Sequence, residues 1–357
     1  MSDNIQGSYV SQKVSKVRWK PEGGLDSQTF VTGSWDDEDN QISLWIYPPL
    51  DNDEDIDFAP IKVCSHPHKS DVTDLKFVDN NNFLVASSLG SVQLMRVVDR
   101  TQAEATHFAI ANSWDNIHYF PTGEESACTG VATFEEDVAT IGEDGRINLL
   151  STREEGSNRV IDDADSCSLR CVCFLKHNEL LTGNARGQMK IWDLRSGAEK
   201  PQSTFMLSGE QIGATCVTPH PTQRHLLLAG GEDGSLTVWD LRENTAPATL
   251  LSAHSQAVSE LQFHPDRPEH VFTCSSSGEL WHWNTASITK FSAINTLNNG
   301  LLEENPWLSN DAVKHRIEVS QLMPPLHLPV NSLDLNRSRM VCGSDTEAVY
   351  VIKNLPI

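Results

Sequence analysis

The sequence contains a short unit that recurs seven times, and this repeat restricts the possible folds more than any other feature. Each unit begins with apolar residues in the spacing h-x-x-h-x-h, where h is apolar and x is any residue. A segment of small residues ending in a tight turn follows, as in LLAGGEDG, and then a third segment with alternating apolar residues, as in LTVWDLR. This alternation predicts β-strands. Five clear copies of the first segment are Val14/Val17/Trp19, Val72/Leu75/Phe77, Leu169/Val172/Phe174, Val258/Leu261/Phe263 and Val330/Leu333/Leu335, and two weaker copies centre on Val131 and Val217.

The spacing of the units predicts the fold class. Between the central positions 131, 172, 217 and 261 the gaps are 41, 45 and 44 residues, which fits the roughly 40–45 residues of one WD-repeat blade. The other gaps, of 58, 56 and 72 residues, require loop insertions, which we place near 48–60, 99–127 and 286–315. We therefore expect residues 1–357 to form a single all-β domain, a seven-bladed WD-repeat β-propeller.

The two ends of the chain are expected to share the seventh blade. The sequence stops directly after the third strand of the seventh unit, VYVIKNL, which leaves this blade without an outer strand. Ser8 to Gln12 precede the first unit and have no blade of their own. Pairing of this segment with the last blade would cover its exposed edge and close the ring. The segment RIEVSQLMP, at 316–324, is expected to supply the outer strand of the sixth blade.

The WD dipeptides mark structural positions within the repeat. They are Trp192-Asp193 and Trp239-Asp240, with Trp283-Asn284 as a diverged copy. Because these dipeptides fall in register with the units, we expect the three indole rings to pack between blades.

A WD repeat also pairs a His before the first strand with an Asp in the tight turn, which satisfies a buried polar network. Asp144 and Asp233 occupy this turn but have no obvious His. His68 and His254 precede a first strand, but Ser or Gly replaces their partners in the turn. We therefore expect no blade to carry the complete set.

Charge and cysteine content exclude several classes of function. With 49 acidic and 27 basic residues the formal charge is -22, so the field repels phosphate backbones and direct nucleic-acid binding is not expected. The start, MSDNIQGSYV, lacks the parts of a secretory signal, and no apolar run approaches the roughly 18 residues that span a bilayer. Membrane insertion is not expected. Eight scattered cysteines then suit reduced thiols in a reducing compartment.

The sequence offers no candidate for catalysis, and we expect neither enzymatic activity nor a cofactor, metal or small-molecule substrate. It lacks G-x-S-x-G, a phosphate loop ending in Gly-Lys, H-E-x-x-H and G-x-G-x-x-G. Aspartates alternate from Asp51 to Asp57 as in a calcium loop, but the Gly and Glu that such a loop requires are missing. The spacing of Cys167, Cys171, Cys173 and His177 does not fit a zinc site, and the cysteines occupy ordinary strand positions.

Two aromatic segments in the insertions are candidates for partner binding. Trp307 and Leu308 lie among acidic residues in LLEENPWLSNDAVKHR, which could form a short amphipathic helix, and Trp114 and Tyr119 lie in the second insertion. For Trp307 we favour burial against the chain's own propeller over partner docking. The same two interpretations apply to Trp114 and Tyr119.

The sequence resembles the nucleoporin forty-three family, WD-repeat subunits of the Y-shaped scaffold complex of the nuclear pore. The resemblance runs from end to end and rests on SQKVSKVRWKP, TGSWDDEDNQISLW, GEDGRINL, IDDADS, GGEDGSLTVWDLR, PEHVFTCSSSGELWHW and VCGSDTEAVYV. It implies a structural role at the nuclear envelope, attachment to a short arm of the complex through an α-solenoid nucleoporin, and presence at kinetochores in mitosis. A rigid ring of exposed loops suits such an architectural subunit.

One alternative function comes from a different class. WDLR occurs twice, ending at Arg195 and Arg242, and consecutive W-D-x-R boxes resemble the adaptor-binding signature of substrate receptors for cullin-RING ubiquitin ligases. An Arg at this position can also form a salt bridge at the blade edge or face water. We favour this structural interpretation.

Overall fold

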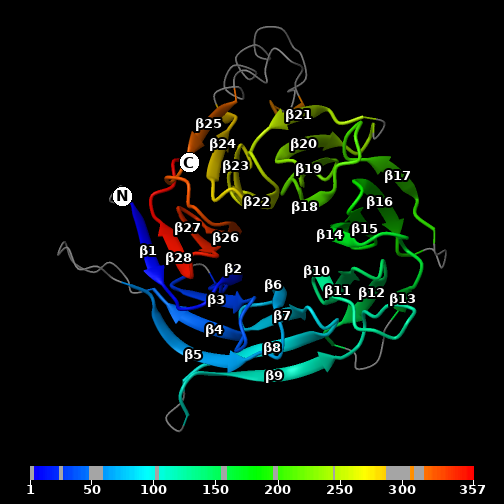
Figure 1. The fold of residues 1–357 in the computed structure, drawn as a ribbon. Coiled ribbons are helices and arrows are strands. Elements are labelled where there is room, and N and C mark those ends of the chain that lie inside the picture. Colours follow the sequence, from blue (N-terminus) through cyan, green and yellow to red (C-terminus); the bar gives the residue numbers. More distant parts are fainter. Residues whose placement is uncertain are drawn as a thin grey trace. The chain divides into compact units, whose positions relative to one another are not determined.

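The regular secondary structure in the described part of the chain consists of β-strands and one short 3-10 helix. The computed structural model describes residues 4–23, 27–47, 59–100, 104–153, 159–195, 200–243, 246–286, 306–308 and 317–357. Within these ranges the strands form seven four-stranded antiparallel sheets, each a blade, as Figure 1 shows. The expected class, an all-β seven-bladed WD-repeat propeller, is confirmed. The chain divides into two compact units, residues 1–172 with 331–356 (unit 1) and residues 173–330 with Ile357 (unit 2).

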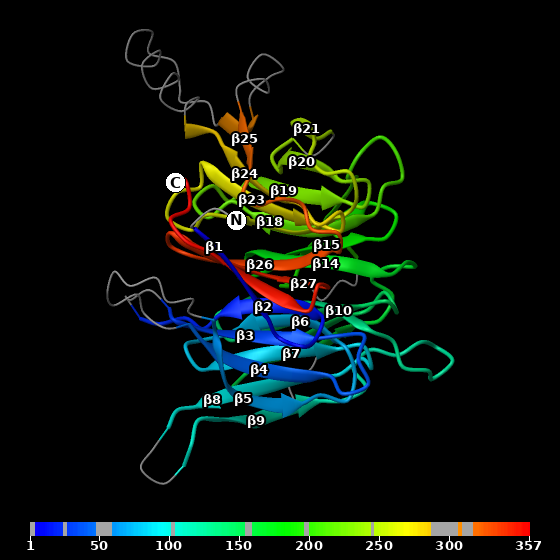
Figure 2. The same ribbon diagram turned by 60° about the vertical axis from the view of Figure 1, so that its left-hand side comes forward.

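Unit 1 contains four of the sheets, and in the first three the strands follow chain order. In Figure 2 the first sheet lies on the second, with their inner strands in contact. The strands are β2 Val14–Trp19, β3 Thr29–Ser34, β4 Gln41–Ile46 and β5 Ile61–Pro67; β6 Val72–Phe77, β7 Asn82–Ser87, β8 Val92–Val98 and β9 His107–Trp114; β10 Cys128–Phe134, β11 Asp137–Gly142, β12 Ile147–Ser151 and β13 Arg159–Ile161; and β1 Ile5–Tyr9 with β26 Val330–Asn336, β27 Arg339–Ser344 and β28 Ala348–Ile352.

Unit 2 contains the other three sheets, and its boundary with unit 1 falls within β14. A short 3-10 helix, η1 Pro306–Leu308, belongs to this unit. The strands are β14 Leu169–Lys176, β15 Glu179–Asn184, β16 Gln188–Asp193 and β17 Ser203–Met206; β18 Ala214–Pro219, β19 Leu226–Gly231, β20 Ser235–Asp240 and β21 Thr249–Ser252; and β22 Val258–Phe263, β23 His270–Ser275, β24 Leu280–Asn284 and β25 Glu318–Gln321.

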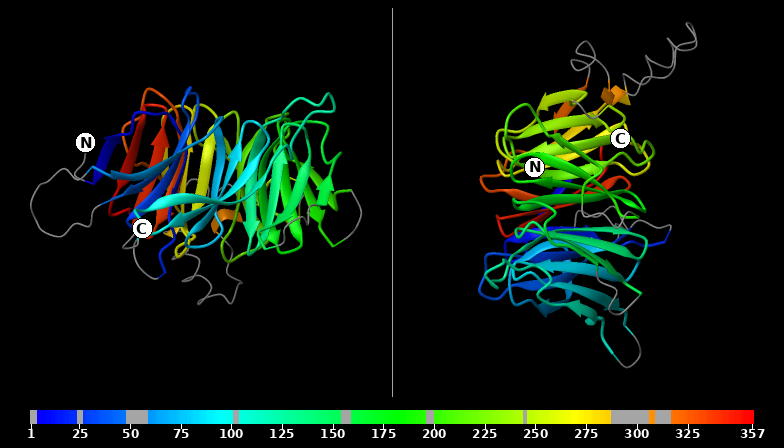
Figure 3. Two further views of the ribbon diagram at one scale, coloured as in Figure 1. Left: turned by 90° about the horizontal axis from the view of Figure 1, so that it is seen from below. Right: turned by 90° about the vertical axis from the view of Figure 1, so that its right-hand side faces the viewer.

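The N-terminal strand completes the last sheet, as expected. In Figure 3 the blue β1 runs beside the red C-terminal strands, and it pairs with β28 from Ile5 opposite Ile352 to Tyr9 opposite Ala348. The strand lies three residues earlier than Ser8–Gln12, because Ser11 adopts a left-handed φ of 65° and turns the chain into β2. β25 pairs with β24, which confirms the outer strand expected at 316–324.

A β-bulge explains the spacing h-x-x-h-x-h of the inner strands. In five of these strands the register shifts after the first residue, so that one extra residue is inserted there. The bulge places the first and fourth residues on the same side of the sheet, where strict alternation would place them on opposite sides. Val72 and Leu75, which stand at these two positions in β6, are both fully buried in one core cluster.

The second residue of an inner strand also joins neighbouring sheets. Thr129 donates a hydrogen bond to the carbonyl oxygen of Leu169 (2.6 Å), and Thr215 does the same to Val258 (2.6 Å). At the junction of the last and first sheets, Asn331 donates to the carbonyl of Val14 (3.0 Å). Each such bond contributes about 1 kcal/mol, and together they align the inner strands of adjacent blades.

Small residues in the middle strands allow the sheets to pack closely. A Cβ atom added to Gly33 would lie 2.4 Å from Val72 of the next sheet, and one on Gly343 would lie 2.4 Å from Val14. The next inner strand therefore packs directly on the glycine backbone. This contact explains why segments such as FVTGSW and MVCGSD contain glycine at this position.

The three expected insertions differ in how much of them the structure describes. Residues 48–58, 287–305 and 309–316, with Asp51 to Asp57, lie outside the described residues. The range 99–127 contains β9, the outer strand of the second blade, followed by a turn that enters β10. Eight residues of this expected insertion, those of β9, are therefore the blade's own fourth strand.

Candidate functional site

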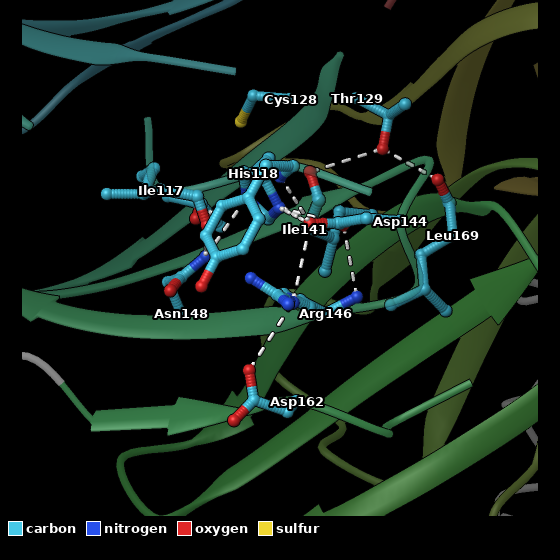
Figure 4. Close-up of polar contacts among 12 residues, drawn as sticks. Ile117, His118, Cys128, Thr129, Ile141, Asp144, Arg146, Asn148, Asp162 and Leu169 are labelled. Carbon is cyan, nitrogen blue, oxygen red and sulfur yellow. Dashed lines mark hydrogen bonds and ion pairs between the residues drawn. The ribbon is translucent and has the colours of Figure 1, made fainter. Parts of the chain in front are cut away.

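A buried polar cluster holds the loop between β9 and β10 against the third blade (Figure 4). His118 Nδ1 lies 3.0 Å from Asp144 Oδ1, and His118 Nε2 lies 2.9 Å from Thr140 Oγ1. The side chain of His118 is fully buried and that of Asp144 is 1% exposed. The expectation that Asp144 has no His was therefore wrong. His118 lies 26 residues before Asp144, in a segment whose residues have no fixed spacing from the repeat, so the sequence pattern does not indicate it as the partner.

Tyr119, the residue after His118, lies on the protein surface next to this buried cluster. The Arg146 guanidinium lies over the Tyr119 ring at 3.7 Å from its centroid, and Arg146 Nε lies 3.3 Å from Asp162 Oδ1. Tyr119 is 41% exposed, and its backbone N donates to Asp144 (3.0 Å). Trp114, at the end of β9, is half-buried and packs on the core between the second and third sheets. Of the four partner-binding candidates, Tyr119 thus offers the most accessible ring, held in one orientation.

The sixth blade carries a second polar cluster, with a glutamate in place of the usual aspartate. His254 Nδ1 lies 3.1 Å from Glu279 Oε2, and His254 Nε2 lies 2.8 Å from Thr273 Oγ1. Thr273 also accepts a hydrogen bond from Trp283 (3.0 Å). Burial lowers the pKa of His254, although Glu279 opposes this shift. The expectation that His254 lacks a partner was wrong, because Glu279 reaches it from one residue beyond the turn glycine.

The three WD tryptophans are buried, and Trp239 and Trp283 pack against side chains of the preceding sheet. Trp192 donates to Thr182 (3.0 Å), just as Trp283 donates to Thr273. Trp239 is 1% exposed, and its Nε1 has no hydrogen-bond partner among the described residues. Ala229 occupies the corresponding middle-strand position, where it cannot accept this bond.

The aspartates of the WD dipeptides each bind the arginine two residues later, just beyond the end of their own strand. Asp193 binds Arg195 through two contacts, Nε to Oδ1 at 3.0 Å and Nη2 to Oδ2 at 2.8 Å. These bonds to Arg195 lower the pKa of Asp193 to about 2. Asp240 binds Arg242 in the same way, with Nε 2.9 Å from Oδ1. Asp233 accepts from the backbone N of Ser235 (3.0 Å) and so fixes the tight turn of its blade.

The insertion residue Trp307 is 1% exposed and lies in the core between the fifth and sixth sheets. Its ring meets Phe263 edge-on with centroids 6.0 Å apart, and its Nε1 donates to the carbonyl of Pro268 (3.2 Å). Leu308 is half-buried against the same cluster. In this structure the indole of Trp307 faces the protein core.

Comparison with known proteins identifies the family. A model described as "WD domain, G-beta repeat" matches residues 59–94, 200–240 and 246–284. Human Nucleoporin Nup43 is 38% identical over 99% of both chains, and the mouse protein is 37% identical over the same share. Arabidopsis thaliana Nuclear pore complex protein NUP43 is 23% identical over 98% of both chains. The chain belongs to the Nup43 family of nucleoporins.

The matched repeats run across the blades of this Nup43-family chain. Each begins at or near the outer strand of one sheet, such as β5 or β17, and continues through strands of the next sheet. A repeat in the sequence therefore covers parts of two blades, which ties neighbouring sheets together covalently. The same offset between repeat and blade applies at the ends of the chain, where the N-terminal strand β1 is the outer strand of the last blade.

The cysteines and other metal-binding residue types of this Nup43-family chain were compared with the geometry that a metal site requires. No set of three or more His, Cys, Asp or Glu residues in the described ranges is arranged to hold a metal ion. The cysteines are free thiols, and burial raises the pKa of Cys342 to about 12. Cys171 and Cys173 lie on β14. No helix in the described ranges is both long and apolar enough to cross a membrane.

Proposed function

We propose that this Nup43-family chain is a non-catalytic structural subunit of the Y-shaped scaffold complex of the nuclear pore. The observation that carries the proposal is the 38% identity to human Nucleoporin Nup43 over 99% of both chains. The scaffold would place the chain at the nuclear envelope, where it supports pore assembly and the transport of proteins and mRNA. Its partners would be other nucleoporins, with an α-solenoid nucleoporin of the short arm as the direct contact.

The polar groups of the blades support a role without catalysis. His118, Asp144, His254 and Glu279 engage one another or threonine hydroxyls within the blades, where they fix turns. The charge of -22 opposes binding to nucleic acid. We propose that the chain uses no cofactor or small-molecule substrate and does not insert into membranes.

Affinity purification of the tagged chain from cells, with cross-linking, tests this function. Recovery of Y-complex nucleoporins, with cross-links to an α-solenoid subunit, is the expected result. A tagged unrelated WD-repeat propeller serves as the control for nonspecific capture. Absence of nucleoporins from the purified material, together with a diffuse distribution in interphase cells, would contradict the proposal.

We further propose that the chain accompanies the Y complex to kinetochores in mitosis. This part follows from the family resemblance, and imaging of the tagged chain in mitotic cells tests it separately. Signal at kinetochores is expected, and its loss after depletion of another Y-complex subunit would show that the complex recruits the chain.

The alternative function, a substrate receptor of a cullin-RING ligase, requires the arginines of the two WDLR boxes to contact a ligase adaptor. Arg195 and Arg242 are exposed, as contact with an adaptor requires, but each already binds its own Asp. Changing both to Ala should leave nucleoporin recovery and nuclear-rim localisation intact. Loss of a ligase adaptor from the purified material, with the fold retained, would favour the alternative.

A further inference from the structure

Trp307 fills a groove between the fifth and sixth sheets. Its indole packs on Phe263, and its Nε1 donates to the carbonyl of Pro268, which precedes β23. Thr249, at the start of β21, donates to the carbonyl of Trp307 (3.3 Å). The groove therefore has a floor of apolar core residues, with polar contacts at its edge.

The preceding pair of sheets contains the equivalent groove, and it is open. Ser203 pairs with Ile191 as Thr249 pairs with Val238, so β17 and β21 occupy matching positions. Arg224 and His225 precede β19 as Pro268 and Glu269 precede β23. The cavity here has a volume of about 450 Å³, within the usual range for ligand pockets. We call it the basic groove; its main lining residues are Leu175, Lys176, Ile191, Arg224, Leu241 and Arg242.

The basic groove differs from its neighbours in charge. Its rim has three cations, Lys176, Arg224 and Arg242, against one anion, Glu179. Lys176 pairs with Glu179, and Arg242 pairs with Asp240. Arg224 is exposed and makes no ion pair with the described residues. At the groove that Trp307 fills, the positions of Lys176, Arg224 and Arg242 are taken by Pro221, Pro268 and Ala286.

A second open groove provides a comparison. It lies between the second and third sheets, has a volume of about 410 Å³, and is bordered by Asp79, Glu135 and Glu136 together with Arg96 and Arg153. Acidic groups outnumber basic groups there. In a chain of net charge -22, the basic groove is thus a local site of attraction for anions.

We propose that the basic groove binds a short acidic segment of another protein through one large aromatic side chain. The aromatic ring would enter between the fourth and fifth sheets, as Trp307 enters between the fifth and sixth. It would pack on Leu175 and Ile191. Acidic residues beside it would pair with Arg224. Aromatic anchors inside a water-excluding rim supply most of the energy of such contacts, and the charges speed encounter and fix orientation. The proposal holds whether or not the chain acts in the pore scaffold.

The chain's own sequence supplies a suitable probe. The peptide LEENPWLSND, residues 302–311, places Trp307 among three acidic residues. A fluorescently labelled synthetic copy would be titrated with the full chain, with anisotropy as the readout. Saturable binding is expected, and replacing the peptide's Trp with Ala should weaken it at least tenfold.

Two protein variants locate the binding site. Arg224→Glu should weaken peptide binding about tenfold, as expected for loss of one charge-assisted contact of about 1.4 kcal/mol. Arg153→Glu makes the same charge change at the comparison groove and should leave binding unchanged within about twofold. Both positions are exposed, so unchanged thermal unfolding will show that the fold is intact.

Three outcomes would overturn the proposal. The first is the absence of saturable binding by the parent peptide. The second is equal binding of the Ala peptide, which would make the contact purely electrostatic. The third is an equal response to Arg224→Glu and Arg153→Glu, which would place the peptide elsewhere. Nuclear-rim localisation of the Arg224→Glu variant is expected to persist, so the scaffold function and the groove can fail separately.

Discussion

Replacing Ala229 with Thr should stabilise the protein, because the new hydroxyl would accept a hydrogen bond from Trp239. Trp45, Trp192 and Trp283 donate to a middle-strand Thr at 2.9–3.0 Å, but the indole Nε1 of Trp239 is buried without such a partner. A satisfied bond contributes about 1 kcal/mol, and an unsatisfied buried donor costs about 1–3 kcal/mol. Fitting two more heavy atoms beside this strand costs about 1 kcal/mol.

The expected net gain is therefore about 1 kcal/mol in the free energy of unfolding, or about 2 °C in Tm for a chain of this size. Urea denaturation followed by tryptophan fluorescence measures the first quantity, and calorimetry the second. Ala229→Val has the shape of Thr without the hydroxyl and is the matched control. Equal stability of the Thr and Val variants would refute the reasoning, because packing alone would then explain any gain.

A reciprocal change and three others test the remaining structural claims. Thr182→Val removes the acceptor from Trp192 and should lower the free energy of unfolding by about 1–3 kcal/mol, measured by urea denaturation. Deleting residues 1–10 removes β1 and the buried Val10 and should cost at least about 3 kcal/mol; an unchanged melting curve would contradict closure by this strand. Gly343→Ala places a Cβ 2.4 Å from Val14 and should cost about 2 kcal/mol, whereas Gly209→Ala, with nothing within 4 Å of the new atom, should be nearly neutral. Burial and, to a smaller extent, the neighbouring His270 lower the pKa of His282 from 6.5 to about 4. As pH drops from 6.5 towards 4 the unfolded chain is protonated before the folded chain, so the free energy of unfolding should fall by about 1–2 kcal/mol. The His282→Gln variant should lose less stability over this range, as measured by urea denaturation.

The polar clusters show where prediction from the sequence stops. Asp144 was recognisable as a turn residue from GEDG, but its partner His118 follows an outer strand of unusual length and has no fixed spacing from the repeat. The repeat pattern does not indicate Glu279 as the partner of His254, because the expected acid stands before the turn glycine, whereas this longer side chain follows the glycine and still reaches His254. Both pairings depend on how the backbone folds over some 25 residues, which local patterns do not specify.

The sequence by itself determined the number of blades, the strand order within them and the sharing of the last blade by both ends. These features follow from local alternation of apolar residues and from repeat spacing, which act over a few residues at a time. Only the tertiary structure decided that Trp307 enters one inter-blade groove while the equivalent groove before it is open. That outcome depends on contacts between Trp307 and residues distant in the chain, such as Thr249, which lies 58 residues earlier, and these are brought together only by folding.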